Sequence, residues 1–245
     1  MPAKLVKNII VFCLVFVFLP ATSIWAASVI TDPALAKAIR TELKLPANKE
    51  VKAADLQKLK SLYPMESKNK IVSLQGLEYA ANLQDLFLPG QKIKNITPLG
   101  KLKKLTFLAV DGNQITDLSP LSGLSSLQKL VVDDNKIKSL VPLKNLHKLT
   151  DLLASNNQVT DLSPLKDLKL EWLILSGNQI QDLTPLKNHP TLEHLYLDDN
   201  LIQELEVLET MPNLKEVSLA NNPLNEQAKQ VIQNLEDNGV IVNIN

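Results

Sequence analysis

The feature that most constrains this chain is a sequence unit that recurs every 22 residues. The segments LAVDGNQITDLSPL at 108–121 and LLASNNQVTDLSPL at 152–165 are nearly the same string. An asparagine keeps the register through the repeats, with one step of 21 residues among steps of 22: Asn113, Asn135, Asn157, Asn178, Asn200 and Asn222, with Gln91 and Asn69 in frame before them. Such a period indicates a stack of similar coils, each burying its apolar face against its neighbours.

The unit reads L-x-x-L-x-x-L-x-L-x-x-N-x-I-x-D-L-x-P-L-x-x, which is the pattern of a leucine-rich repeat. Leucines at its seventh and ninth positions alternate with variable residues, as in a short strand with one buried face. The asparagine amide can both donate and accept, so it can satisfy backbone groups where the chain turns inward. The proline blocks a long helix on the return side, where short 3₁₀ or extended pieces are expected. The fold class predicted is an α/β solenoid with a parallel β-sheet on its concave face.

Both open ends of such a stack need a cover. At the N-terminus, Asp32 can cap a helix that has Pro33 at its first position and a stripe of Leu35, Ile39 and Leu43, and a second short helix is expected over about 53–59. At the C-terminus, a helix with an apolar face at Ala228, Val231, Ile232 and Leu235 is expected to stop near Gly239 and to lead into a strand over 240–244. The prediction is one domain over 28–245, with a cap at about 28–62, repeats at about 63–222 and a cap at 223–245.

The first 27 residues have the three parts of a secretory signal peptide: lysines at the start, an apolar run over 9–19, and small residues up to Ala27. The run is too short for a membrane span, which needs about 20 apolar residues. Removing this segment takes away Cys13, the single cysteine, and leaves 24 basic and 26 acidic residues. The sequence therefore predicts an exported protein, extracellular or periplasmic, that is not inserted in a membrane after cleavage. It offers no cysteine for a disulfide or metal site and no basic excess for nucleic acid.

The coil with I-x-D-L-x-P-L resembles the internalin-type repeats of exported bacterial proteins. The N-terminal segment carries matching phrases, DPALAKAI at 32–39, ADL at 54–56 and LQGLEY at 74–79. The resemblance implies a right-handed solenoid whose concave sheet face binds protein partners. Internalins proper usually continue into an immunoglobulin-like domain and a surface anchor, and neither is recognised in this sequence.

Positions 6, 8 and 10 of the unit flank the inward leucines and are expected to project from the concave face. Position 6 holds Asp85, Phe107, Lys129, Asp151, Trp172, His194 and Glu216. Position 8 holds Phe87, Ala109, Val131, Leu153, Ile174, Tyr196 and Ser218, and position 10 holds Pro89, Asp111, Asp133, Ser155, Ser176, Asp198 and Ala220. Four of the six aromatic residues beyond residue 27 fall in these columns, and Val131, Leu153 and Ile174 connect them.

Strand propensity alone can account for aromatic and β-branched residues on a sheet. A contiguous exposed apolar patch rimmed by charge nevertheless favours an interaction site, with Trp and Tyr as anchors. We therefore predict a non-catalytic module that recognises a protein partner through Trp172, Tyr196 and Phe107. The predicted rim is Lys129, Asp151, His194 and Glu216, and Phe87 completes the stripe. Aromatic rings beside carboxylates also suit sugars, so a glycan is the alternative ligand.

Two other kinds of site have weaker support. Asp111 and Asp133 occupy adjacent coils and could approach the separation of a glycosidase pair, but no closed cleft is expected around them. Paired aspartates at 133–134 and 198–199 could offer oxygens to Ca²⁺, although a solvated acidic edge is the better explanation. Neither a cofactor nor a metal is therefore predicted.

Overall fold

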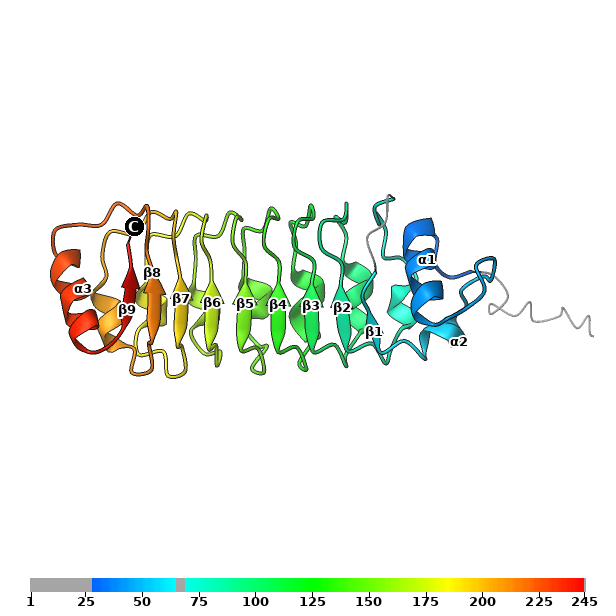
Figure 1. The fold of residues 1–245 in the computed structure, drawn as a ribbon. Coiled ribbons are helices and arrows are strands. Elements are labelled where there is room, and N and C mark those ends of the chain that lie inside the picture. The colour runs from blue at the N-terminus through cyan, green and yellow to red at the C-terminus, as the bar shows by residue number, and fades with distance from the viewer. Residues whose placement is uncertain (1–27, 65–68, 245) are drawn as a thin grey trace, which may run out of the picture.

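The computed structural model describes residues 28–64 and 69–244, and within them the chain forms one sheet of nine parallel strands. The strands follow one another in chain order, as Figure 1 shows. They are β1 (Ser61–Leu62), β2 (Asp85–Phe87), β3 (Phe107–Ala109), β4 (Lys129–Val131), β5 (Asp151–Leu153), β6 (Trp172–Ile174), β7 (His194–Tyr196), β8 (Glu216–Ser218) and β9 (Ile241–Asn243). This order is that of a leucine-rich-repeat solenoid, and it confirms the predicted fold class.

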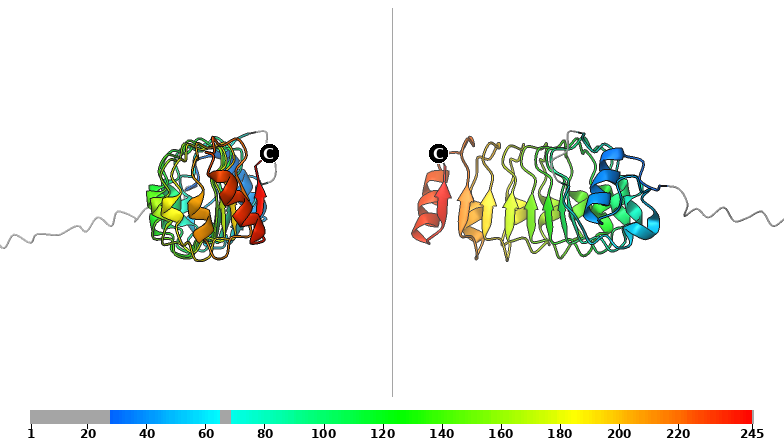
Figure 2. Two further views of the ribbon diagram at one scale, coloured as in Figure 1. Left: turned by 90° about the vertical axis from the view of Figure 1, so that its left-hand side faces the viewer. Right: turned by 45° about the vertical axis from the view of Figure 1, so that its right-hand side comes forward.

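The return segments carry short 3₁₀ helices, as the once-per-repeat proline predicts. Figure 2 looks along the solenoid in its left panel and shows these helices on the side opposite the strands. They are η1 (Leu77–Tyr79), η2 (Thr97–Lys101), η3 (Ser119–Gly123), η4 (Val141–Leu143), η5 (Ser163–Leu165), η6 (Thr184–Leu186) and η7 (Glu206–Thr210). The aspartate of the repeat caps several of them: Asp117 accepts from the Ser119 amide at 2.7 Å, and Asp161 accepts from the Ser163 amide at 2.8 Å.

Between sheet and return segments, the leucines of every coil form one continuous core that is almost completely buried. The asparagines line the turn that follows each strand. Asn157, for example, accepts from the Ile137 amide of the previous coil at 2.9 Å and donates to the carbonyls of Val132, Ala154 and Ser155. The amide therefore pairs buried backbone groups of two coils, as its donor and acceptor atoms predict.

The two ends are covered as expected, with shorter elements. Helix α1 (Pro33–Glu42) begins at the Asp32 cap, and α2 (Ala53–Leu56) ends three residues before the predicted position. Helix α3 (Ala228–Asp237) packs on the last coil, Gly239 follows it at φ 84°, and β9 extends the sheet. Strand β1 lies inside the segment predicted to be cap alone, so the sheet begins earlier than expected. The predicted signal peptide, 1–27, lies outside the described residues.

The structure reveals one repeat rule that the sequence reading missed. The residue before Gln91 and before each repeat asparagine from Asn113 to Asn222 (the asparagine ladder) has a positive φ, between 52° and 70°. Glycine, asparagine and aspartate tolerate this left-handed conformation best. They fill this position in seven coils: Gly90, Gly112, Asp134, Asn156, Gly177, Asp199 and Asn221. Asp134 and Asp199 are thus explained by backbone geometry, which removes the main sequence argument for a Ca²⁺ site.

His189 breaks the leucine pattern inside the core. It occupies the first position of its unit, where the other coils have leucine, alanine or methionine, and it is 2 % exposed. Within the described part of the chain, neither ring nitrogen has a hydrogen-bond partner. Burial lowers the pKa of His189, and the nearby Leu168 backbone offsets this only in part. The imidazole is therefore held neutral in an apolar layer.

Replacing His189 by leucine should stabilise the protein by about 1–2 kcal/mol, because it removes a buried polar group that lacks partners. The pKa of His189 is lower in the folded protein than its unfolded value of about 6.5. The free energy of unfolding of the wild type therefore decreases as the pH falls below that value. The gain from His189→Leu should therefore widen at pH 5 relative to pH 7.5 in urea unfolding. Replacing the exposed His147 by leucine is the control. A gain that does not change with pH would contradict a buried neutral imidazole.

Candidate protein-binding face

The strand registers bring the predicted site residues together. From β2 to β8 each column residue pairs with its equivalent in the next strand, for example Asp151 with Trp172 and Trp172 with His194. All eleven predicted residues lie on strands of this one face, half-buried or exposed. Ala109 and Ser218 are buried instead, at 1 % and 9 % exposure, because their short side chains lie below those of their neighbours.

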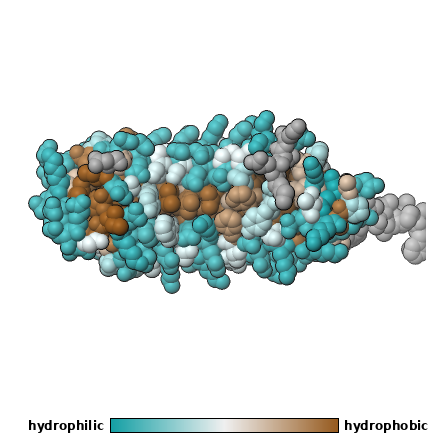
Figure 3. Space-filling model, in the orientation of Figure 1, coloured by the Kyte–Doolittle hydropathy of each residue, from teal (hydrophilic) through white to brown (hydrophobic). Residues whose placement is uncertain are grey.

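The apolar residues of the face form a stripe along the sheet. Figure 3 shows hydrophobic side chains running across the middle strands between hydrophilic margins. Phe87 and Trp172 are 37 % and 38 % exposed, and Val131, Leu153 and Ile174 are half-buried between them. The face therefore presents apolar surface to solvent, with its leucines turned inward.

Tyr63 extends this stripe and was missed in the sequence. It is 47 % exposed, and its ring centroid lies 6.0 Å from that of Phe87. The 22-residue frame does not predict this neighbour because the step from Ser61 to its partner Asp85 is 24 residues. Only the three-dimensional pairing of β1 with β2 reveals it.

The aromatic groups of β6 and β7 form the most ordered part of the face. Trp172 stacks on His194 with ring centroids 3.8 Å apart and an interplanar angle of 15°. Tyr196 lies nearly parallel to the same indole, at 6.3 Å and 11°. Offset stacking of this kind holds large side chains in place without covering their edges. Trp172 is thus a preorganised, solvent-accessible ring.

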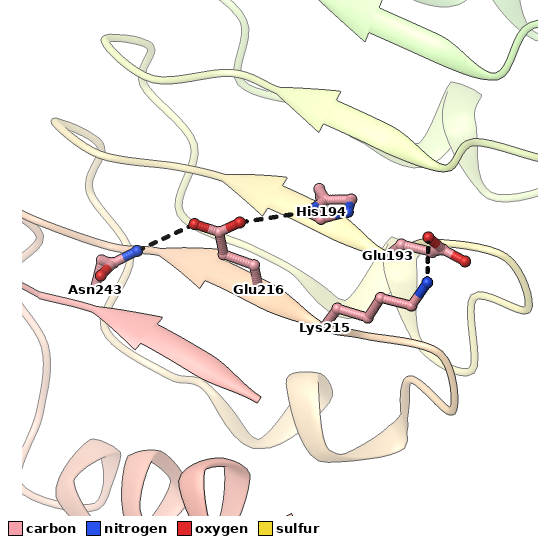
Figure 4. A network of polar contacts seen from close by, with 5 residues as sticks. All are labelled: Glu193, His194, Lys215, Glu216 and Asn243. Carbon is pink, nitrogen blue, oxygen red and sulfur yellow. Dashed lines mark hydrogen bonds and ion pairs between the residues drawn. The ribbon is translucent and has the colours of Figure 1, made fainter. Parts of the chain in front are cut away.

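Polar contacts fix this cluster from the C-terminal side, as Figure 4 shows. Oε2 of Glu216 lies 3.4 Å from Nδ1 of His194, and Asn243 donates to the other carboxylate oxygen at 3.4 Å. On the strand margin, Lys215 forms an ion pair with Glu193 at 2.7 Å. Burial, followed by the carboxylates of Glu216 and Asp198, raises the pKa of Tyr196. Tyr196 therefore remains a neutral phenol at physiological pH.

Two of the three aspartates at position 10, Asp133 and Asp198, accept hydrogen bonds from the next coil. Asp198 accepts from the Ser218 hydroxyl at 2.5 Å and from the Ala220 amide at 2.8 Å. Asp133 accepts from the Ser155 amide at 2.6 Å. Burial is the main cause that raises the pKa of Asp111 and Asp133, and the negative charge of Asp111 adds to the effect at Asp133. The carboxylates of Asp133 and Asp198 are thus held at the strand ends by hydrogen bonds. No cluster of three or more metal-ligating side chains occurs in the described residues.

A parallel sheet with one asparagine ladder, 3₁₀ return segments and an exposed aromatic stripe defines a leucine-rich-repeat solenoid with an exposed apolar face. The family described as "Leucine Rich repeats (2 copies)" matches residues 81–123, 125–167, 169–210 and 190–232. A comparison with curated proteins gives no match. None of the helices in the described residues has the length and apolar character to span a bilayer.

Similar solved structures show which type of leucine-rich-repeat protein this chain is. An internalin C2 from Listeria monocytogenes is 32% identical with a TM-score of 0.79, over 89% of this chain and 95% of that one. An internalin, InlF, from the same organism is 30% identical with a TM-score of 0.80, over 88% of this chain and 63% of that one, so the chain spans less than two thirds of InlF. The plant peptide hormone receptor RGFR1 in complex with RGF2 is 25% identical with a TM-score of 0.55, over 61% of this chain and 26% of that one. The chain therefore belongs to the leucine-rich-repeat family and, within it, to the internalin type.

Proposed function

We propose that this chain is an exported, non-catalytic module that binds a protein partner through the sheet face. The observation that carries the proposal is the stripe from Phe87 to Tyr196, with Trp172 held in a stack and still exposed. Exposed apolar patches with polar margins are typical of interaction surfaces, and Trp and Tyr are common anchors there.

Two further observations support it. The structural relatives are internalins, and the receptor RGFR1 was solved in complex with RGF2, so similar solenoids do bind polypeptides. The N-terminal sequence has the composition of a secretory signal, which supports export to the cell exterior or the periplasm.

Removing two anchors should abolish tight partner binding. A partner captured from protein extracts on the immobilised chain should bind the Trp172→Ala, Tyr196→Ala variant at least about 30-fold more weakly, since a true anchor contributes about 2 kcal/mol or more. Titration calorimetry with the purified partner measures this ratio. The matched control removes two exposed apolar side chains outside the face, Val141→Ala and Leu201→Ala.

Each contrary outcome identifies a different error. Equal affinities for the wild type and the anchor variant would exclude the sheet face as the binding surface. Displacement of the captured partner by soluble glycans would favour a carbohydrate ligand. Substrate turnover that is lost in Asp111→Asn would contradict a purely binding role.

A further inference from the structure

The charges of the sheet face differ from those of the whole chain. The complete sequence holds 26 basic and 26 acidic residues. The three outward columns of β2 to β8 hold six carboxylates and one lysine: Asp85, Asp111, Asp133, Asp151, Asp198 and Glu216, with Lys129. The proposed binding face is therefore acidic, and a partner of complementary charge is basic.

The single lysine of these columns is already paired. Nζ of Lys129 lies 3.8 Å from Oδ2 of Asp151, and its side chain is 45 % exposed. An exposed pair at this distance is weak and can be exchanged for another cation. Asp151 can therefore accept a basic group supplied by a partner.

The geometry of Trp172 places an aromatic surface beside that carboxylate. Within the described residues, the ring contacts of the indole are to His194 and Tyr196, both on β7. Since these rings lie nearly parallel to the indole, they cover its β7 side. Its other side is turned toward β5, where Asp151 is the direct register partner of Trp172. An indole face beside a carboxylate, at the spacing of adjacent strands, is suited to a planar cation.

We propose that the β5–β6 part of the face binds an arginine side chain from a basic segment of the protein partner, with the guanidinium stacked on Trp172 and paired with Asp151. The proposal rests on the proposed function, because it names the partner chemistry of the same face. Arginine fits better than lysine because its guanidinium is planar, stacks on aromatic faces and offers several donors to a carboxylate. Lys129 competes for the same carboxylate.

The test uses a dye-labelled tri-arginine peptide and the same peptide with citrulline, its uncharged analogue, in place of arginine. Fluorescence anisotropy with the full chain at low salt should show binding of the arginine peptide, and at least tenfold weaker binding of the citrulline peptide. Asp151→Asn should weaken arginine binding about 3- to 10-fold, and Trp172→Ala should weaken it at least tenfold. Lys129→Ala should strengthen it about threefold by freeing Asp151. Asp167→Asn, an exposed carboxylate on the return side, is the charge-matched control.

Several results would overturn the proposal. These are equal binding of the arginine and citrulline peptides, equal losses in Asp151→Asn and Asp167→Asn, or weaker binding in Lys129→Ala. Circular dichroism of each variant separates misfolding from loss of the site. If the captured partner still depends on Trp172 and Tyr196 while tri-arginine does not bind, the arginine site is wrong and the protein-binding function stands. If neither the partner nor the peptide depends on these residues, both are wrong.

Discussion

Replacing Asn157 by alanine should lower the free energy of unfolding by about 4 kcal/mol. The side chain makes four hydrogen bonds to backbone groups of two coils. Its loss leaves the buried Ile137 amide without that acceptor, at a cost of about 1–3 kcal/mol. It also removes the two N–H donors that three carbonyls share, at about 1 kcal/mol each. The effect is large because the Asn157 amide and the backbone groups that it pairs are buried.

The neighbouring asparagines limit the loss of stability in the Asn157→Ala variant. Carbonyl oxygens along the turn accept from two neighbours: the Ala154 oxygen also accepts from Asn178, and the Val132 oxygen from Asn135. These carbonyls keep one partner in the Asn157→Ala variant, so the Ile137 amide is the group left without this acceptor. The unfolding transition should therefore shift without the coils separating into independent units.

Urea unfolding followed by circular dichroism measures this loss. The control is Asn156→Gly, which keeps the left-handed backbone of the adjacent exposed residue and removes only its bond to Asp134. It should change stability by no more than about 0.5 kcal/mol. Similar decreases in the free energy of unfolding of the two variants would contradict a specific stabilising role for the asparagine ladder.

The comparison of Asn157 with Asn156 shows which parts of the fold are readable from sequence. The period, the leucine alternation and the fixed asparagine each follow from one local physical requirement, so they predict the solenoid directly. The left-handed position before the asparagine is just as regular, but three residue types share it and it does not look like a motif. The burial of His189 depends on the neighbouring coils and could not be predicted from one unit.

For the candidate face, the columns of residues were predictable from the sequence, but the contacts between side chains were not. Once strands of equal register are assumed, period two places Trp172, Tyr196 and Phe107 on one side, and the structure agrees. The stack of Trp172 on His194 could not be predicted, because it depends on side-chain rotamers across two strands. Tyr63 was missed for a different reason, since the irregular 24-residue step between the first two strands breaks the frame.

The N-terminal cap depends on Asp32, and Asp32→Ala should lower the free energy of unfolding by about 3 kcal/mol. One carboxylate oxygen accepts from the Ala34 and Leu35 amides at the start of α1, and the other accepts from the Val72 and Ser73 amides of the first coils. Loss of a helix cap costs about 1 kcal/mol, and two further amides lose their acceptor. The residue thus joins the cap to the repeats, which the sequence indicated only as a helix start.

The contribution of Asp32 should depend on pH with a definite sign. Burial raises its pKa, but the bonds from the Leu35, Val72, Ser73 and Ala34 amides outweigh burial and hold the pKa below its usual 3.8. A depressed carboxyl pKa stabilises the fold above the unfolded value, and this stability is lost as the pH falls through the folded value. The difference between wild type and Asp32→Ala should therefore be constant from pH 7 to about 4.5 and shrink only below about 4.

Urea unfolding of both proteins across this range tests the dependence, with Asp167→Asn as an exposed carboxylate that should change little at any pH. Hydrogen exchange locates the effect: the amides of α1 and of residues 72–73 should lose protection before those of β4 to β7, because they share the Asp32 carboxylate at the end of the stack. Uniform loss of protection along the solenoid would mean that the cap and the repeats unfold as a single unit. In that case Asp32 would stabilise the whole stack, and its removal should lower the midpoint of the only transition observed.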